Sequence, residues 1–190
     1  MLAFVLVGGI IPVLSNERKP MLATLADLLA PVSTSEFLEV FRAKKRLHIA
    51  ASDSTRAETL FSWREIDTLL TEHALDEDVI ITRDGVLIPR QLYTSSEGKQ
   101  LNVRAFHDLL SQGVSIVVNS VDRWVPQIGQ LAAAIEREMG IYTDVNAYLS
   151  FFKGGAFKPH WDFMDVLVVQ VHRAARSSSD SAKCLVESQL

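Results

Sequence analysis

Residues 157–171 read FKPHWDFMDVLVVQV, and this stretch decides the fold. Its second half, 165–171, is a run of β-branched and aliphatic residues, which is typical of a buried strand. Its first half holds His160 and Asp162 with one residue between them. Residues two apart in a strand project from the same face, so an imidazole and a carboxylate would lie side by side.

This pair is two-thirds of a known metal-binding set. Two histidines and one carboxylate form the facial triad that binds non-haem iron(II) and leaves positions open for oxygen and a co-substrate. His160 and Asp162 alone are a short pattern that occurs by chance in many chains. The alternative is a surface strand on which the two side chains only pair with each other.

Upstream of residue 141, helix and strand signals alternate at short spacing. Ser33 with Glu36 and Ser62 with Glu65 form capping boxes, each followed by apolar residues at helical spacing. Asp84-Gly85 predicts a hairpin turn between two β-branched runs. The expected helices are 21–29, 33–44, one from 62, 102–112 and 127–139, and the expected strands are 47–50, 79–82, 86–88, 114–118, 142–152, 157–160 and 165–171.

The order of these elements predicts the fold class. Helices and a hairpin come first, and a run of strands begins only after about residue 141. We expect an α+β domain whose N-terminal helices and hairpin lead into an incomplete barrel-type sheet. An unpaired strand edge promotes aggregation, so the strand 166–171 is a predicted aggregation site if nothing pairs with it.

Composition narrows the class of protein. The chain has 190 residues, 48% of them hydrophobic and 22% charged, which suits one globular domain. Its net charge of −4 argues against binding nucleic acid through the overall field. The cluster Arg42, Lys44, Lys45 and Arg46 is better explained as a solvated helix end.

The two ends of the chain give further expectations. Cys184 is the only cysteine, so no internal disulfide can form and the cytoplasm is the expected compartment. Residues 2–14 are apolar but too short to span a bilayer. They also lack the basic region of a secretory signal, so a buried strand or a helix-covering arm is expected.

A longer pattern around the histidine resembles the metal-binding core of JmjC-type cupins, a family that includes the ribosomal oxygenases. NAYLS at 146–150, the glycine pair at 154–155 and the whole of 157–171 are similar to the family's core in order and spacing. The upstream stretches PVSTSEF at 31–37, KKRLHI at 44–49, FSW at 61–63 and GVSIVVN at 113–119 are similar to its earlier landmarks.

The resemblance implies a double-stranded β-helix (jelly-roll) barrel and an Fe(II)- and 2-oxoglutarate-dependent protein hydroxylase. His160 and Asp162 would bind the metal, and Asn146 and Tyr148 would line the co-substrate pocket. The substrate would be a protein, with a ribosomal protein as one candidate, without direct nucleic-acid or membrane binding; a homodimer stays open. From the residues alone, Asn146 could equally be a strand-end residue and Tyr148 a plain core residue.

The sequence departs from the family after residue 171. The family has a basic residue that binds 2-oxoglutarate there, whereas residues 172–176 read HRAAR. The family's second metal histidine follows much later, whereas only His172 follows Asp162. His48, His73 and His107 are expected to be ordinary surface or core histidines. A frameshift or early stop near residue 171, or a partner chain that supplies the missing strands, would explain the departure.

These observations predict three segments of the chain and leave alternative functions open. Residues 1–20 would be an apolar arm, 21–171 the N-terminal part of a JmjC-like domain, and 172–190 a polar, disordered or out-of-frame tail. The chain would be incomplete and inactive alone. The alternative is a non-catalytic cupin-like binding or dimerisation module. A third reading takes 21–140 as a plain interaction domain and the H-x-D as coincidence.

Overall fold

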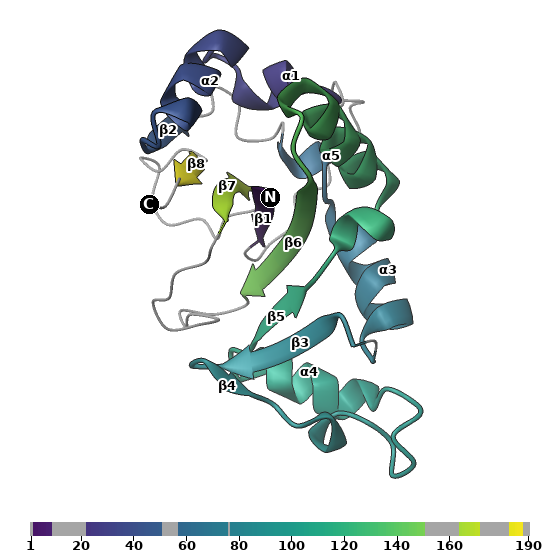
Figure 1. Ribbon diagram of the computed structural model, residues 1–190. Helices are drawn as coiled ribbons and strands as arrows, with labels where there is room; N and C mark the ends of the chain where they lie inside the picture. Colours follow the sequence, from purple (N-terminus) through teal and green to yellow (C-terminus); the bar gives the residue numbers. More distant parts are fainter. Residues whose placement is uncertain are drawn as a thin grey trace.

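The structure is a computed structural model that describes residues 2–8, 22–50, 57–75, 77–150, 164–171 and 183–187. Figure 1 shows helices along one side of a single sheet of eight strands. The strands are β1 (Leu2–Gly8), β2 (Leu47–Ala50), β3 (Val79–Arg83), β4 (Val86–Leu87), β5 (Ser115–Val118), β6 (Thr143–Ser150), β7 (Asp165–Gln170) and β8 (Lys183–Glu187). The helices are α1 (Leu25–Leu29), α2 (Thr34–Arg42), α3 (Trp63–His73), α4 (Val103–Ser111) and α5 (Pro126–Met139), and the 3-10 helices are η1 (Ala57–Thr59), η2 (Arg90–Leu92) and η3 (Val121–Arg123).

Local signals in the sequence set the helix ends. The Ser33 hydroxyl accepts a hydrogen bond of 3.2 Å from the backbone N–H of Glu36 at the start of α2. At the start of α3, the backbone N–H of Ser62 donates to the Glu65 carboxylate at 2.8 Å. Helix α5 ends at Gly140, whose φ of 68° is left-handed and suits glycine. The helix starts predicted at Ser33 and Ser62 and the α5 stop are therefore confirmed, whereas α1 begins at Leu25 and not at residue 21.

The predicted hairpin is also present. Asp84 and Gly85 connect β3 and β4, and their φ angles are 52° and 77°. Two successive positive φ angles match the twist of a two-residue hairpin turn, which is why aspartate and glycine are favoured there.

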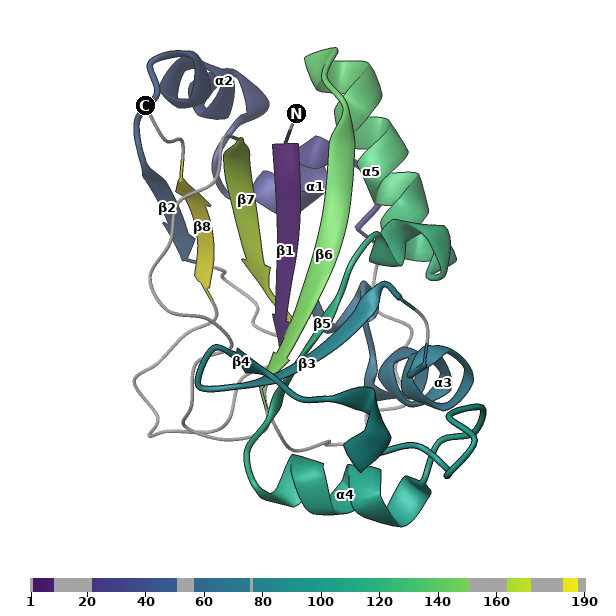
Figure 2. The ribbon, with the colours of Figure 1, turned by 60° about the horizontal axis from the view of Figure 1, so that its bottom comes forward.

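The sheet contains one strand arrangement that the sequence did not predict. The strand order is β2-β8-β7-β1-β6-β5-β3-β4, and Figure 2 shows the first five of these side by side. β1 lies parallel between β6 and β7, so residues 2–8 of the apolar N-terminal segment form a strand, which was one of its two predicted alternatives. The other strand pairs are antiparallel.

Strand β7 pairs with β1 on one side and with β8 on the other. The aggregation site predicted at 166–171 required a strand without partners, and this condition is not met. β8 lies inside the segment predicted to be a polar tail, and it also pairs with β2. The α+β class is confirmed. The described strands form an open sheet, and the jelly-roll barrel and the domain boundaries stay predictions.

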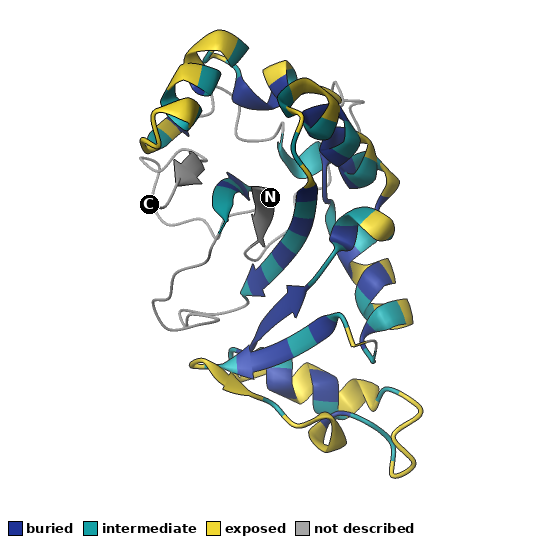
Figure 3. Cartoon of the chain, in the orientation of Figure 1, coloured by how far each residue is buried: buried dark blue, intermediate teal, exposed yellow. Residues whose placement is uncertain are grey.

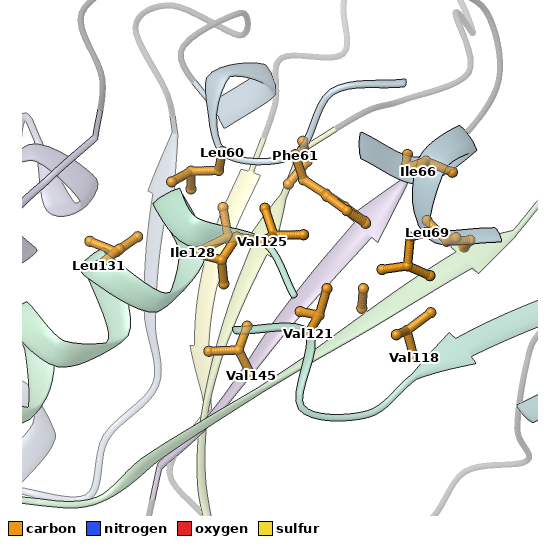
Figure 4. Close-up of a cluster of buried hydrophobic side chains, with 14 of the residues drawn as sticks. Leu60, Phe61, Ile66, Leu69, Val118, Val121, Val125, Ile128, Leu131 and Val145 are labelled. Carbon is orange, nitrogen blue, oxygen red and sulfur yellow. The ribbon is translucent and has the colours of Figure 1, made fainter. Parts of the chain in front are cut away.

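The core lies between the sheet and the helices. Figure 4 shows Phe61 beside Val125, Leu69 above Val118, and Ile128 above Val145 of β6, all within one hydrophobic cluster. Ile128 is fully buried, as is Val145. This packing fixes one face of β6 against α5, so the residues of the opposite face are held in defined positions.

Candidate functional site

The predicted metal ligands lie outside the described residues. His160 and Asp162 fall within residues 151–163. In the parts of the chain that the structure describes, no three His, Cys, Asp or Glu side chains gather as a metal site. The described frame of the candidate site is therefore β6, which precedes residues 160–162, and β7, which follows them.

Strand β6 brings the two predicted co-substrate residues to one face. Along β6, buried and half-buried residues alternate, as the two colours on this strand in Figure 3 show. Val145 and its alternate neighbours are buried, whereas Asn146 and Tyr148 are half-buried. Because alternate residues share a face, Asn146 and Tyr148 lie together on the side of β6 away from the core.

The pairing of β1 relates β6 to β7. Val5 of β1 is the register partner both of Asn146 in β6 and of Val168 in β7. Adjacent strands are about 4.8 Å apart, so the Asn146 and Val168 backbones are separated by roughly 10 Å across β1. Asn146 therefore lies at the same level of the sheet as Val168 of β7, the strand that follows the H-x-D segment.

The short turn after β5 forms hydrogen bonds with side chains and backbone of β6. The backbone N–H of Ser120 donates to Oδ1 of Asn146 at 3.0 Å. The Ser120 hydroxyl donates to Oδ1 of Asp144 at 3.1 Å. Asp122 accepts a hydrogen bond from the backbone N–H of Val145 at 3.3 Å. The turn thus holds three consecutive residues of β6.

Asp122 and Asp144 are two carboxylates close to this turn. Burial raises the pKa of Asp122, and the nearby charge of Asp144 raises it further. The Val145 N–H bond and the charge of Arg123 act in the opposite direction. A half-buried carboxylate is costly to charge, and the hydrogen bond that Asp122 accepts from the Val145 N–H partly offsets that cost.

An ion pair between Lys44 and Asp165 connects the helical part of the chain to β7. The Lys44 ammonium lies 2.7 and 2.9 Å from the two carboxylate oxygens of Asp165, the first residue of β7. It also lies 5.3 Å from the centre of the Phe41 ring. Lys44 follows the end of α2 and is exposed, in agreement with the solvated helix end predicted for this basic cluster, and it also forms an ion pair with a residue 121 positions away.

The described histidines lie away from β6 and β7. His73 of α3 packs against Trp124 with ring centroids 4.0 Å apart and ring planes tilted by 32°, and His107 is exposed on α4. His73 also lines a cavity of about 180 Å³ together with Arg64, Glu72 and Trp124. That volume is below the roughly 300 Å³ at which small-molecule sites usually begin. His48 lies exposed in β2, so His48 and His107 are surface residues and His73 packs against an aromatic ring.

Sequence reasoning missed Ser120, Asp122 and Asp144. Ser120 has a left-handed backbone, with φ 50° and ψ 43°. Such a conformation is usually signalled by glycine or asparagine, and serine gives no such signal. The contacts of this turn also cross from one strand to another, which local sequence patterns do not report.

Comparison with known proteins gives a distant similarity. No family model matches the chain. Bifunctional lysine-specific demethylase and histidyl-hydroxylase NO66 of Drosophila persimilis is 26% identical over 159 residues, which cover 80% of this chain and 22% of the relative. The protein of the same name from Culex quinquefasciatus is 27% identical over 76% of this chain and 22% of its own length. The one from Drosophila melanogaster is 23% identical over 78% of this chain and 23% of its own length.

These relatives are named as hydroxylases. The similarity extends over most of this chain, which spans about a fifth of the length of the curated relatives it matches. It supports a relationship to JmjC-type oxygenases at the level of the family resemblance. Separately, none of the helices described combines the length and apolar character that a membrane crossing requires.

Proposed function

We propose that this chain carries the metal-binding part of an Fe(II)- and 2-oxoglutarate-dependent protein hydroxylase of the JmjC type. The observation that carries the proposal is the similarity of about 80% of the chain to proteins named as NO66 hydroxylases. The H-x-D sequence with its flanks agrees with it, as does the shared face of Asn146 and Tyr148 on β6.

The donor set suits iron only in part. An imidazole and a carboxylate, from His160 and Asp162, are the ligand types of non-haem iron(II) sites. A complete facial triad adds a second histidine, and the described residues bring none to β6 or β7. A site with two protein ligands binds iron weakly, so we expect low affinity and little turnover from this chain alone.

Each residue then has a defined task. When bound, iron(II) with 2-oxoglutarate supplies the oxygen activation that hydroxylation needs. His160 and Asp162 would hold the metal, and Asn146 and Tyr148 would orient the co-substrate. The protein substrate, a ribosomal protein among the candidates, and the cytoplasmic compartment remain part of the proposal.

Metal titration tests this function. The full chain is titrated with Mn(II), which replaces iron(II) without oxidising, and binding is followed by calorimetry. We expect wild type to bind one Mn(II) and His160→Ala to lose binding. His107→Ala is the matched control, because it removes an exposed histidine from α4 and should bind as wild type does.

The same titration decides the alternative. A non-catalytic cupin-like module is favoured by the lack of a second histidine near β6 and β7 in the described part of the chain. If wild type and His160→Ala show the same absence of Mn(II) binding while both are folded, the hydroxylase proposal is refuted and this module replaces it.

A further inference from the structure

Strand β1 joins two parts of the sheet. β7 pairs with β1 and β8, and β6 pairs with β1 and β5. Among the described strands, β1 is therefore the link between β2-β8-β7 and β6-β5-β3-β4, as its position in Figure 2 shows. Its backbone lies close chiefly to these two neighbours. The sheet that frames the candidate site is continuous only when a strand fills this position.

The position of β1 is a slot that is one strand wide. Residues 2–8 are in register with 143–149 of β6, and residues 2–7 are in register with 165–170 of β7. Neighbouring strands are about 4.8 Å apart, so without β1 the facing edges of β6 and β7 would be separated by roughly 10 Å. Each edge would carry a row of unpaired N–H and C=O groups, and such edges bind an extended segment through main-chain hydrogen bonds.

The sequence of β1 suits a slot with a strand on either side. Residues 2–8 read LAFVLVG, without a charged side chain. Continuous apolar runs of this kind are typical of strands inside parallel sheets. β1 is parallel to both neighbours, whereas the other strand pairs are antiparallel, and parallel pairing is slightly less stable per residue. β1 thus matches the slot but is held by the weaker of the two kinds of pairing.

We propose that β1 is exchanged between two copies of this chain, so that the slot between β6 and β7 of each copy binds β1 of the other copy. Residues 9–21 connect β1 to the described part that begins at Leu22. At about 3.5 Å per residue, a link of this length reaches up to about 45 Å when extended. Every copy carries both the strand and the slot, so two copies can complete each other's sheets reciprocally.

Exchange replaces each strand pairing by an identical one. Its main cost is therefore the loss of freedom on association, and this cost falls as the protein concentration rises. In the exchanged dimer, Val5 of one copy lies between Asn146 and Val168 of the other, so each candidate site is framed by strands of both copies. Exchange needs no metal, so it is independent of whether the chain is a hydroxylase.

Paired cysteines test whether β1 enters a second copy. Val5 and Asn146 are register partners in adjacent strands, whose spacing of about 4.8 Å suits a disulfide. One batch of the full chain carries Val5→Cys and a second carries Asn146→Cys, both with Cys184→Ser to remove the native thiol. The batches are unfolded, mixed, refolded at high concentration and oxidised, and linked dimers are measured by non-reducing electrophoresis. We expect a linked dimer, and its loss when the second batch carries His107→Cys, an exposed position on α4, in place of Asn146→Cys.

A chain that carries both Val5→Cys and Asn146→Cys measures the balance between the two arrangements. A monomer that keeps its own β1 forms the disulfide within the chain, whereas the exchanged dimer forms it between chains. We expect the share of disulfides between chains to rise with the protein concentration during refolding. Disulfides only within the chain at every concentration, together with no linked dimer from the mixed batches, would overturn the exchange.

A proline variant tests the slot separately. Val5→Pro removes an N–H and is poorly tolerated in the middle of a sheet, so β1 of this variant should leave the slot open. A fluorescent peptide with the sequence of residues 2–8, extended by lysines for solubility, should then bind the full Val5→Pro chain in an anisotropy titration. The same peptide with proline in place of Val5 is the matched control, and we expect loss of binding.

Equal binding of the two peptides, or binding of neither, to a folded Val5→Pro chain would show that the slot does not select an extended strand and would overturn the proposal. If Val5→Pro does not fold, the cysteine pairs decide, because they leave the backbone of β1 able to pair.

Discussion

Gly129 lies in α5 where the helix touches the η3 turn, and its replacement by alanine should destabilise the protein. In an ordinary helix interior, glycine to alanine stabilises by about 1 kcal/mol. Here a Cβ would lie 2.7 Å from the backbone carbonyl oxygen of Asp122, closer than the 3.0 Å that real Cβ contacts respect. Two backbone elements would have to move apart, and such overpacking costs about 1–3 kcal/mol.

The clash between two backbones is expected to outweigh the gain in helix propensity, so Gly129→Ala should lower the free energy of unfolding, by up to about 2 kcal/mol. Urea unfolding measured by circular dichroism gives this value directly. Gln130→Ala is the matched control, because this neighbouring residue is exposed and should stay within about 0.5 kcal/mol of wild type. A Gly129→Ala protein as stable as wild type, or more stable, would refute the reasoning.

Three further changes test other contacts. Ser33→Ala removes the hydroxyl that caps α2 and should cost about 1 kcal/mol in urea unfolding; an unchanged midpoint would contradict this. A double-mutant cycle with Lys44→Met and Asp165→Asn should give a coupling of about 0.5–1 kcal/mol that shrinks in high salt, since Lys44 is 44% exposed and Asp165 only 16%; zero coupling would mean the pair is unimportant. Burial raises the pKa of Asp122 in the folded protein above its ordinary value of 3.8. At a pH above this raised pKa the carboxylate is charged in both states, and its charge lowers the stability of the folded state. The loss of stability disappears as the pH falls through the raised pKa towards the ordinary value, because the group becomes protonated. Asp122→Asn should therefore unfold at higher urea than wild type at pH 7, with a difference that narrows toward pH 4; a difference that widens in acid would contradict the sign.

Local chemistry made much of the fold predictable. The caps at Ser33 and Ser62, the turn at Asp84-Gly85 and the stop at Gly140 each depend on residues within about one helical turn or one hairpin loop of each other. Their physical causes are contained in short stretches of sequence. For this reason the sequence patterns predicted them without knowledge of the tertiary structure.

Pairing between distant segments was not predictable in the same way. β1 reads as an apolar run, but nothing in it indicates that β6 and β7 flank it. β8 lies in a segment whose composition predicts a tail, and it pairs both with β7, the strand before it in the sequence, and with β2 from far earlier in the chain. The choice of strand partners depends on which edges remain free after the rest of the sheet forms, and periodicity does not contain that information.

The candidate site also has one part that local sequence patterns predict and another that depends on tertiary packing. The shared face of Asn146 and Tyr148 follows from the period of two along β6, so the sequence could predict it. The hold of Ser120 on Asn146 and the ion pair of Lys44 with Asp165 join residues 26 and 121 positions apart. Both depend on tertiary packing that brings separate elements together.

The central claim is that this chain binds a metal beside β6 and β7, and paramagnetic NMR tests it most directly. Mn(II) is added to the isotope-labelled full chain, and the broadening of each backbone amide is measured in wild type and in His160→Ala. The account predicts the strongest broadening at amides of β6 and β7, including Asn146 and Val168, little effect on α4, and loss of the effect in His160→Ala. Broadening elsewhere, or broadening that persists in His160→Ala, would contradict it.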